Sequence, residues 1–448
     1  MNLTREMANR IASVALKQIP EEAYRHAQRC MIDGLAVAVA GANETSTRLV
    51  RDFSLNQGQA SGASLWAHPA QTTPLMAALV NGVAAHALDF DDIQQAVPLH
   101  GTVGVLPAIV AVAEDRNASM ADLLLAFAVG LETSIRIGLA LGRSHTSRGW
   151  HPTGTANTFG AAAGAGKILG LDADGFANAL ALAAGQASGL LHTVLGTMAK
   201  SLNAGKAAMN GLLSALLAER GFTGPRDVFT LEKGYPQAAS HEFDPSRLNS
   251  DWSSRWELAD ISFKLVAAGS LAHTAFYGAR SIHMEESVRP EDIAEIELNV
   301  CQWQVDIVGL KTPTKGLDGK FSLTYCAALG LAGRRGFLDD FSDDRVHDPT
   351  LVSLMGKIKY KIIPEKSVIA CQIQVRMKDG RTIQRHVPVP RGFPGNRANE
   401  EELEEKHRSL MEPVLGKVAV DEILTLVRES SDVTPVTRLT KALAQPSR

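Results

Sequence analysis

The sequence predicts a mainly α protein in which a large all-helical domain is interrupted by a smaller α/β (α+β) domain. Residues 1–218 read as apolar stripes at helical spacing, with no credible strand between them. Alternating apolar and polar runs, typical of half-buried strands, first occur beyond residue 290, and charged helical sequence returns near the C-terminus. Because 448 residues exceed what one core usually serves, we expect two domains, formed by residues 1–264 with 396–448 and by residues 265–395.

Composition limits the classes of partner. Lys plus Arg number 45 and Asp plus Glu number 48. This near-balance gives no excess of positive charge that would favour binding to nucleic acid or an anionic membrane. The four cysteines form no CxxC pair, so we expect free thiols in a reducing cytoplasm. Charges interrupt the N-terminal residues, which argues against a signal peptide, and no apolar run reaches the ~18 residues needed to span a bilayer. We therefore expect a cytoplasmic protein with no nucleic-acid or membrane partner.

Caps and apolar spacing indicate the helices of the first half. Pro20, followed by Glu21 and Glu22, begins a helix whose apolar stripe ends at Gly41. Ser119 is a suitable N-cap because its hydroxyl accepts a hydrogen bond from an unpaired amide. Further helices are predicted over residues 46–55, 73–86, 106–115, 119–141, 172–184 and 209–220.

The segment TFGAAAGAGKIL (residues 158–169) is close to a phosphate-binding loop but does not match one. Ala161 stands where the first glycine is required, and Lys167 is followed by Ile168 rather than by serine or threonine. The glycines also have the wrong spacing for a dinucleotide fingerprint. Small residues at this spacing let two helices pack closely, so we expect a helix seam here and no cofactor.

The second half contains the predicted strands. Residues 292–302 alternate apolar and polar side chains. Residues 367–377 and 381–389 do the same, and Lys378, Asp379 and Gly380 between them are a strong hairpin signal. Residues 319–331 predict a helix, and residues 400–415 begin the C-terminal helices.

Five titratable residues lie close together between two apolar runs: His86, Asp89, Asp91, Asp92 and His100. We expect a helix that carries His86 and Asp89 on one face and continues to Ile93, with His100 opening the next helix. A carboxylate at a helix C-terminus is unfavourable, which points to a functional site. The alternative is that Asp91 and Asp92 are solvated charges and the histidines hydrogen-bonded linkers. A metal is not expected, because oxygen-rich metal sites usually show tighter spacing and HEXXH is absent.

Several polar residues stand alone in apolar, glycine-rich surroundings, and together they suit one reaction class. Removing a proton next to a carboxylate needs a positioned base and fixed cations that stabilise the developing negative charge. If a leaving group then departs, the result is dehydration or decarboxylation; if a proton returns on the other face, it is epimerisation. The residues are Asp89, His100, Arg148, His151, Lys200, Lys264 and Tyr325.

Structural alternatives exist for the residues of this set and for their neighbours. Lys206 is interpreted as a solvated lysine, and His192 as a core histidine. Lys264 either extends its ammonium to solvent past apolar neighbours or is functional. Tyr325 lies in an apolar helix, where a packed tyrosine with one hydrogen bond is the commoner case.

Seven motifs in order resemble one family: HALDFDD (86–92), HGTVGVLPAIVAVAE (100–114), GWHPTGTANTFGAAAGAGKILGLD (149–172), KSLNAGKAAMNG (200–211), GFTGP (221–225), ISFK (261–264) and DGKFSLTYCAA (318–328). They resemble the MmgE/PrpD family, which includes 2-methylcitrate dehydratase, cis-aconitate decarboxylase and iminodisuccinate epimerase. The resemblance implies a large helical domain with a smaller α/β lid, an active site between them and a homodimer.

The resemblance also implies roles for individual residues. The family's active-site residues fall on Asp89, His100, His151, Lys200, Lys264 and Tyr325. We expect Lys200, Lys264 and Arg148 to bind carboxylates, His151 or Asp89 to take the proton, and His100 or Tyr325 to act as acid. His86, Gln186 and Ser270 complete the predicted substrate-binding set, together with Arg148.

Two departures from the family pattern affect the choice of reaction. Ile93 stands where aconitate decarboxylases have threonine, and Gly269 stands where members often have cysteine or histidine. Both weigh against decarboxylation. We therefore expect a cofactor-independent lyase, a dehydratase similar to 2-methylcitrate dehydratase, acting on a small di- or tricarboxylic acid. The alternative is an epimerase of a dicarboxylate such as iminodisuccinate; a decarboxylase or a non-catalytic binding protein is less favoured.

Overall fold

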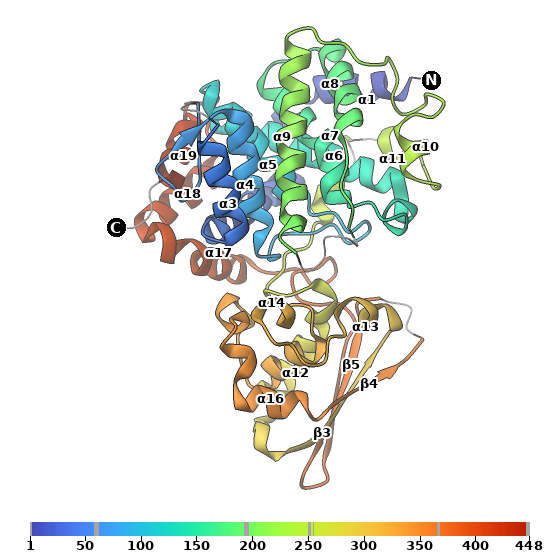
Figure 1. Cartoon of the computed structure of the whole chain (residues 1–448), viewed down its shortest axis with the longest axis vertical. Helices are drawn as coiled ribbons and strands as arrows, with labels where there is room; N and C mark the ends of the chain where they lie inside the picture. The colour runs from blue at the N-terminus through green and yellow to red at the C-terminus, as the bar shows by residue number, and fades with distance from the viewer. Residues whose placement is uncertain are drawn as a thin grey trace. The chain divides into compact units, whose positions relative to one another are not determined.

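The computed structural model describes residues 2–57, 62–191, 197–249, 252–253, 255–364 and 368–444. The chain divides into two compact units, one formed by Met1–Ile261 with His407–Arg448 and the other by Ser262–Lys406 (Figure 1). The first is helical and the second combines helices with a small mixed sheet. A mainly α protein with some sheet is therefore confirmed.

The first unit is built on helices that pack side by side. Helices α4, α5 and α7 all pack against α9, and α6 packs along α7 (Figure 1). The N-terminal and central helices are α1 (Leu3–Ser13), α2 (Glu21–Gly41), α3 (Thr45–Leu55), α4 (Pro74–Ala87), α5 (Gly101–Asp115), α6 (Met120–Ser147), α7 (Pro152–Ile168), α8 (Ala173–Gln186) and α9 (Ala199–Glu219). The shorter and C-terminal helices are α10 (Tyr235–Ala239), α11 (Ser246–Asn249), α18 (Lys417–Glu429) and α19 (Val436–Ala444). The boundary between the units falls within α17 (Glu400–Leu415), which belongs to the first unit from His407 onward.

Local signals explain most of these boundaries. Ser119 caps α6 as predicted, since its hydroxyl accepts a hydrogen bond from the Asp122 amide. The expectation of no strand before residue 218 was wrong in one detail, because β1 (Ala63–Ser64) and β2 (Gln71–Thr72) form a two-residue antiparallel pair. Helix α5 begins at Gly101 with His100 as its N-cap, as predicted, and includes the predicted span 106–115.

Helix α6 extends beyond the predicted end at Leu141, but its helical geometry is interrupted at Gly142, which has φ +66°. Its length and composition alone would let it cross a bilayer, the one such helix in the described part of the chain, so the expectation of no sufficiently long apolar run was wrong. However, 89% of its most apolar window is buried inside the protein. The helix also carries the buried Arg136–Glu132 ion pair, with 2.6 Å between Nε and Oε1. These features are those of a core helix.

The glycine-rich segment forms a close helix seam, as predicted. A Cβ at Gly160 of α7 would lie 2.6 Å from the Gly130 carbonyl of α6, and one at Gly164 would lie 2.2 Å from Ile109. Only glycine fits at these contacts, and α7 can therefore lie deep between α5 and α6. This depth matters because the N-terminus of α7 carries His151.

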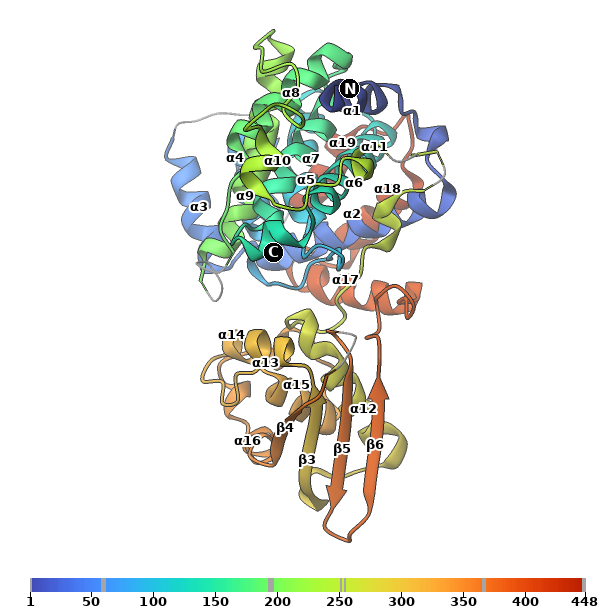
Figure 2. The same ribbon diagram turned by 90° about the vertical axis from the view of Figure 1, so that its right-hand side faces the viewer.

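The second unit contains a four-stranded mixed sheet in the order β4-β3-β5-β6 (Figure 2). The strands are β3 (Ile293–Val300), β4 (Ile358–Ile362), β5 (Cys371–Met377) and β6 (Thr382–Val387). β3 pairs parallel with β4 and antiparallel with β5. The β5–β6 hairpin is confirmed, with Gly380 at φ +92°, whereas β4 was not predicted. Ser367, the first residue of the predicted strand 367–377, lies outside the described residues.

Helices complete the second unit. α12 (His273–Glu286) packs against β5 and β6 and also against α15 (Leu323–Leu331). Gly278 of α12 allows the approach, since a Cβ there would lie 2.8 Å from Ile373 of β5. The remaining helices are α13 (Gln302–Val308), α14 (Gly316–Gly319) and α16 (Pro349–Met355).

The seam between α6 and α7 makes a stability prediction. Gly160→Ala should lower the free energy of unfolding by about 1–3 kcal/mol, because the added methyl meets backbone that cannot move cheaply. The matched control is Gly185→Ala in α8, where a Cβ would meet nothing within 4 Å; it should be neutral or stabilising by about 0.5–1 kcal/mol. Urea midpoints of the two variants measure this. Equal midpoints would contradict the seam.

Candidate active site

Four helix ends in the first unit bring the predicted site residues together. His86 lies in the last turn of α4, His100 is the N-cap of α5, and His151 is the N-cap of α7. Lys200 is the second residue of α9. The rings of His86 and His100 have centroids 4.7 Å apart, and those of His86 and His151 are 6.0 Å apart. A continuous cluster of three imidazoles and one ammonium results.

Asp91 holds two of these imidazoles. Its Oδ2 lies 3.0 Å from Nδ1 of His86 and 2.7 Å from Nδ1 of His100. Because a carboxylate only accepts, His86 carries its hydrogen on Nδ1, and Nε2 is its basic nitrogen. Nδ1 of His100 lies close to the same carboxylate oxygen, which favours the same tautomer for that ring. Asp91 is fully buried, and the two imidazoles hold the pKa of its carboxyl well below the ordinary value despite the opposing effect of burial.

Lys200 connects the histidine cluster to Asp89. Its Nζ lies 2.8 Å from Nε2 of His86 and 3.1 Å from Oδ1 of Asp89. His86 is thus bridged between Asp91 and Lys200. Burial, opposed by Asp91 and reinforced by the Lys200 charge, lowers the pKa of His86 to about 4, so His86 is neutral at pH 7.

The loop after α4 corrects two expectations from the sequence. The helix ends at Ala87, close to the predicted span 73–86, so Asp89 and Ile93 do not lie on it. Asp89 adopts φ +53°, a left-handed conformation that Asp tolerates better than most residues. Asp91 and Asp92 are fully buried rather than solvated. His86 and Asp89 still meet, but through Lys200 rather than along one helix face.

His151 is oriented by a residue that sequence reasoning did not select. Nδ2 of Asn203, one turn after Lys200 on α9, lies 3.1 Å from Nδ1 of His151. The His151 amide donates to the carbonyl of Gly189 at 2.9 Å, which fixes the backbone at the helix start. Burial, together with the nearby Lys200 charge, lowers the pKa of His151 well below its ordinary value.

Asp92 belongs to a second group of buried polar side chains. It accepts a hydrogen bond from Thr102, and its pKa is raised to about 8 by burial and by the neighbouring Asp33 carboxylate. Asp33 in turn pairs with His407, with 3.2 Å between Oδ1 and Nε2. The group joins α2 and α17 to the loop that carries Asp91.

A metal could in principle use the same atoms as Asp91. His86, Asp91 and His100 each offer a ligand atom, all within 4.8 Å of one another. Hydrogen bonds already account for this convergence, and the Lys200 ammonium at His86 would repel a cation. The absence of a metal remains a prediction.

The other predicted site residues lie elsewhere. Arg148 of the first unit is exposed and bonds His241 and the Ala238 carbonyl, and Gln186 donates to Ser214 at 2.8 Å. Lys206 is half-buried rather than solvated and donates to Ser188 at 2.7 Å. Three predicted residues belong to the second unit: Lys264, Ser270 and Tyr325. His192 lies outside the described residues.

The predicted residues of the second unit differ in burial. Lys264 is buried, whereas Ser270 is half-buried at the start of a short 3-10 turn. Tyr325 is buried and donates its hydroxyl hydrogen to the Asp340 carbonyl at 2.5 Å, the packed arrangement that the structural alternative described. The catalytic roles of Lys264 and Tyr325 remain predictions.

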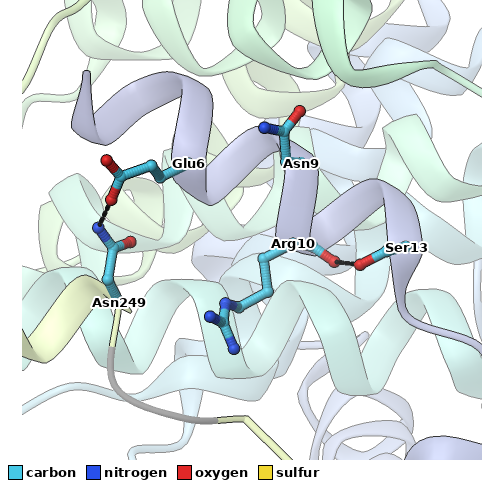
Figure 3. A pocket seen from close by; sticks show the side chains of 5 residues that line it. All are labelled: Glu6, Asn9, Arg10, Ser13 and Asn249. Atoms are coloured by element: carbon cyan, nitrogen blue, oxygen red, sulfur yellow. Dashed lines mark hydrogen bonds between the residues drawn. The ribbon is translucent and has the colours of Figure 1, made fainter. Parts of the chain in front are cut away.

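A separate hollow of about 650 Å³ lies on the first unit beside α1 (Figure 3). Glu6 there accepts from Asn249 at 2.6 Å, and Ser13 bonds the Arg10 carbonyl. None of the lining residues belongs to the histidine cluster. We assign this hollow no part in the chemistry.

Comparison with protein-family models shows the family to which the chain belongs. The model of the MmgE/PrpD N-terminal domain matches residues 5–248, and that of the MmgE/PrpD C-terminal domain matches residues 266–432. The chain therefore belongs to the MmgE/PrpD family, as the motifs predicted.

Curated relatives narrow the comparison. Cis-aconitate decarboxylase of Homo sapiens is 28% identical over 463 residues, covering 100% of this chain and 95% of the relative. Cis-aconitate decarboxylase of Aspergillus terreus is 27% identical over 481 residues, covering 99% and 96%. A cis-aconitate decarboxylase-like protein of Aspergillus oryzae is 26% identical over 457 residues, covering 94% and 93%. The decarboxylases among them are lyases.

The buried Asp92 carboxyl predicts an unusual pH dependence. Its pKa is about 8 in the folded chain and about 3.8 for an ordinary aspartic acid, so the folded chain binds one more proton than the unfolded chain between these pH values. Its contribution to stability is therefore lost as pH rises from 4 to 8, by up to about 1.4 kcal/mol per pH unit. Asp92→Asn cannot titrate, so its melting temperature relative to wild type should rise with pH.

The control for this measurement is Asp432→Asn, which changes an exposed carboxyl of the same unit. Its melting temperature relative to wild type should stay constant between pH 5 and pH 9. A difference between Asp92→Asn and wild type that is independent of pH would show that Asp92 titrates normally.

Proposed function

We propose that this protein is a cofactor-independent lyase that removes a proton next to a carboxylate of a small di- or tricarboxylic acid. The observation that carries the proposal is the buried cluster in which Asp91 orients His100 and His86 while Lys200 supplies a fixed cation. An oriented imidazole and a nearby ammonium are what enolate-forming chemistry requires.

His100 is the best candidate for the base. The carboxylate of Asp91 fixes its Nδ1–H, leaves Nε2 with the lone pair and stabilises the imidazolium that forms when the proton arrives. From the sequence alone, His151 or Asp89 was expected to take the proton. The carboxylate of Asp89 is already paired with the Lys200 ammonium, and Nδ1 of His151 is already an acceptor for Asn203.

Lys200 is the candidate cation for the substrate. Its ammonium already bonds Asp89 and one neutral imidazole, so an incoming carboxylate would share the hydrogens of the ammonium with Asp89. The same charge stabilises the negative charge that develops on the substrate carboxylate as the proton leaves. Lys264 remains a predicted second cation.

Dehydration is the reaction we propose first, because Ile93 replaces the threonine expected of the decarboxylases. Decarboxylation is the second candidate, and the observation in its favour is that the curated relatives named above are cis-aconitate decarboxylases. A homodimer and a cytoplasmic location remain predictions.

The reaction is identified by its products. Purified protein is incubated in deuterated buffer with methylcitrate, citrate, cis-aconitate, iminodisuccinate and tartrates. Dehydration gives a new double bond that absorbs in the ultraviolet, decarboxylation releases carbon dioxide, and epimerisation incorporates solvent deuterium without either. His100→Ala should reduce turnover about 100-fold or more. Turnover within a few-fold of wild type would remove His100 as the base, and no reaction with any acid would contradict the proposal.

Lys200→Met tests the proposed carboxylate contact. The variant should raise KM for the acid about tenfold or more, since the cation that meets the carboxylate is lost. The matched control is Lys206→Met on the same helix, whose ammonium bonds Ser188 rather than the cluster. An equal effect of both substitutions would show that only the general charge of α9 matters.

A further inference from the structure

We infer that Asn203 is a positioning residue that fixes the hydrogen of His151 on Nε2, so that His151 meets the substrate as a hydrogen-bond donor. That His151 meets a substrate rests on the proposed function. The position of its hydrogen, however, is a property of the protein without substrate. Asn203 lies in the motif KSLNAGKAAMNG (200–211) but is not among the predicted site residues.

The orientation of the Asn203 amide is fixed by a second partner. Its Nδ2 lies 3.2 Å from the carbonyl oxygen of Leu190 as well as 3.1 Å from Nδ1 of His151. A carbonyl oxygen accepts only, so the group facing Leu190 must be the NH₂ rather than the amide oxygen. The two hydrogens of one NH₂ thus serve the two partners.

The tautomer of His151 follows from this geometry. Nδ1 accepts from Asn203 and therefore holds a lone pair, so the hydrogen of the neutral ring is on Nε2. Among the described residues, Nε2 of His151 has no hydrogen-bond partner. An N–H already fixed in direction can stabilise negative charge that develops on a substrate oxygen without taking up a proton.

The surroundings keep the ring neutral and Asn203 in place. The charged and titratable groups that act on His151 are Lys200, His86, His100 and Asp89, and of these only Asp89 favours the imidazolium. Gly154 and Gly189 make room for the amide, since a Cβ at Gly189 would lie 3.1 Å from Cγ of Asn203 and one at Gly154 would lie 3.3 Å from its Cβ. Gly189 also has φ +149°.

The two outer histidines of the cluster therefore differ in tautomer. His100 is held by a carboxylate with its hydrogen on Nδ1, whereas His151 is held by an amide with its hydrogen on Nε2. One ring presents a basic nitrogen and the other presents an N–H. Two histidines can therefore play different parts, His100 as a base and His151 as a hydrogen-bond donor.

The first experiment reads the tautomer directly. Protein labelled with ¹⁵N-histidine is studied by NMR without substrate, and the His151 signals are identified by their loss in His151→Gln. Wild type should show the hydrogen on Nε2. Asn203→Asp, which offers only acceptors, should move it to Nδ1 and raise the pKa of the ring. A wild-type hydrogen on Nδ1 overturns the inference, whether or not the protein is active on any acid tested.

The second experiment connects the tautomer to turnover. Asn203→Asp should reduce kcat about 100-fold, the usual loss when one fixed donor is removed. The matched control, Asn210→Asp, changes an asparagine two turns further along α9 that bonds the Gln186 carbonyl, and it should keep kcat within about twofold of wild type. Equal losses in both variants would mean that Asn203 acts only on structure.

Substitution of His151 separates a donor from a base. Glutamine carries an amide N–H close to where Nε2 lies and an oxygen that can accept from Asn203, but no basic nitrogen. His151→Gln should therefore keep about tenfold more activity than His151→Ala. The ratio of its activity to that of wild type should not fall between pH 6 and pH 8. Equal inactivity of the two variants would assign His151 as a base and overturn the inference.

Discussion

The site depends on one buried carboxylate. Asp91 is fully buried, hydrogen-bonds to Nδ1 of His86 and lies 2.7 Å from Nδ1 of His100. Removing a carboxylate from water costs several kcal/mol, which only well-directed hydrogen bonds offset. Once these bonds form, both rings are fixed in direction and tautomer. The basic nitrogen of His86 is then used by Lys200, which leaves His100 as the imidazole best suited to accept a proton.

The side chains around Asp91 come from the ends of several helices rather than from their faces. The last turn of α4 and the first residues of α5, α7 and α9 all contribute to the cluster. Such convergence needs helices that approach closely, and the contacts of Gly160 with α6 and of Gly82 with Gly205 of α9 provide it. The glycine-rich sequence that resembles a nucleotide loop is therefore part of the packing that positions His151.

Much of this was predictable from the sequence, for identifiable reasons. Apolar spacing and caps such as Ser119 are local signals, so most helices and the β5–β6 hairpin were predicted correctly. The grouping of Asp89, His100, His151 and Lys200 followed from the family motifs. The left-handed turn at Asp89 and the burial of Asp91 and Asp92 depend on α2, α5 and α9, which no local pattern reveals. Asn203 was missed because a polar residue on a helix carries no signal of its partner, although it lies in the motif KSLNAGKAAMNG and three residues after Lys200.

The most direct test of the account is to locate the hydrogens around Asp91. Neutron diffraction from deuterium-exchanged crystals grown near pH 7 without substrate would show them individually. The account predicts deuterium on Nδ1 of both His86 and His100 and none on the Asp91 carboxylate. Deuterium on Asp91, or a bare Nδ1 on His100, would contradict the claim that this carboxylate orients the proposed base.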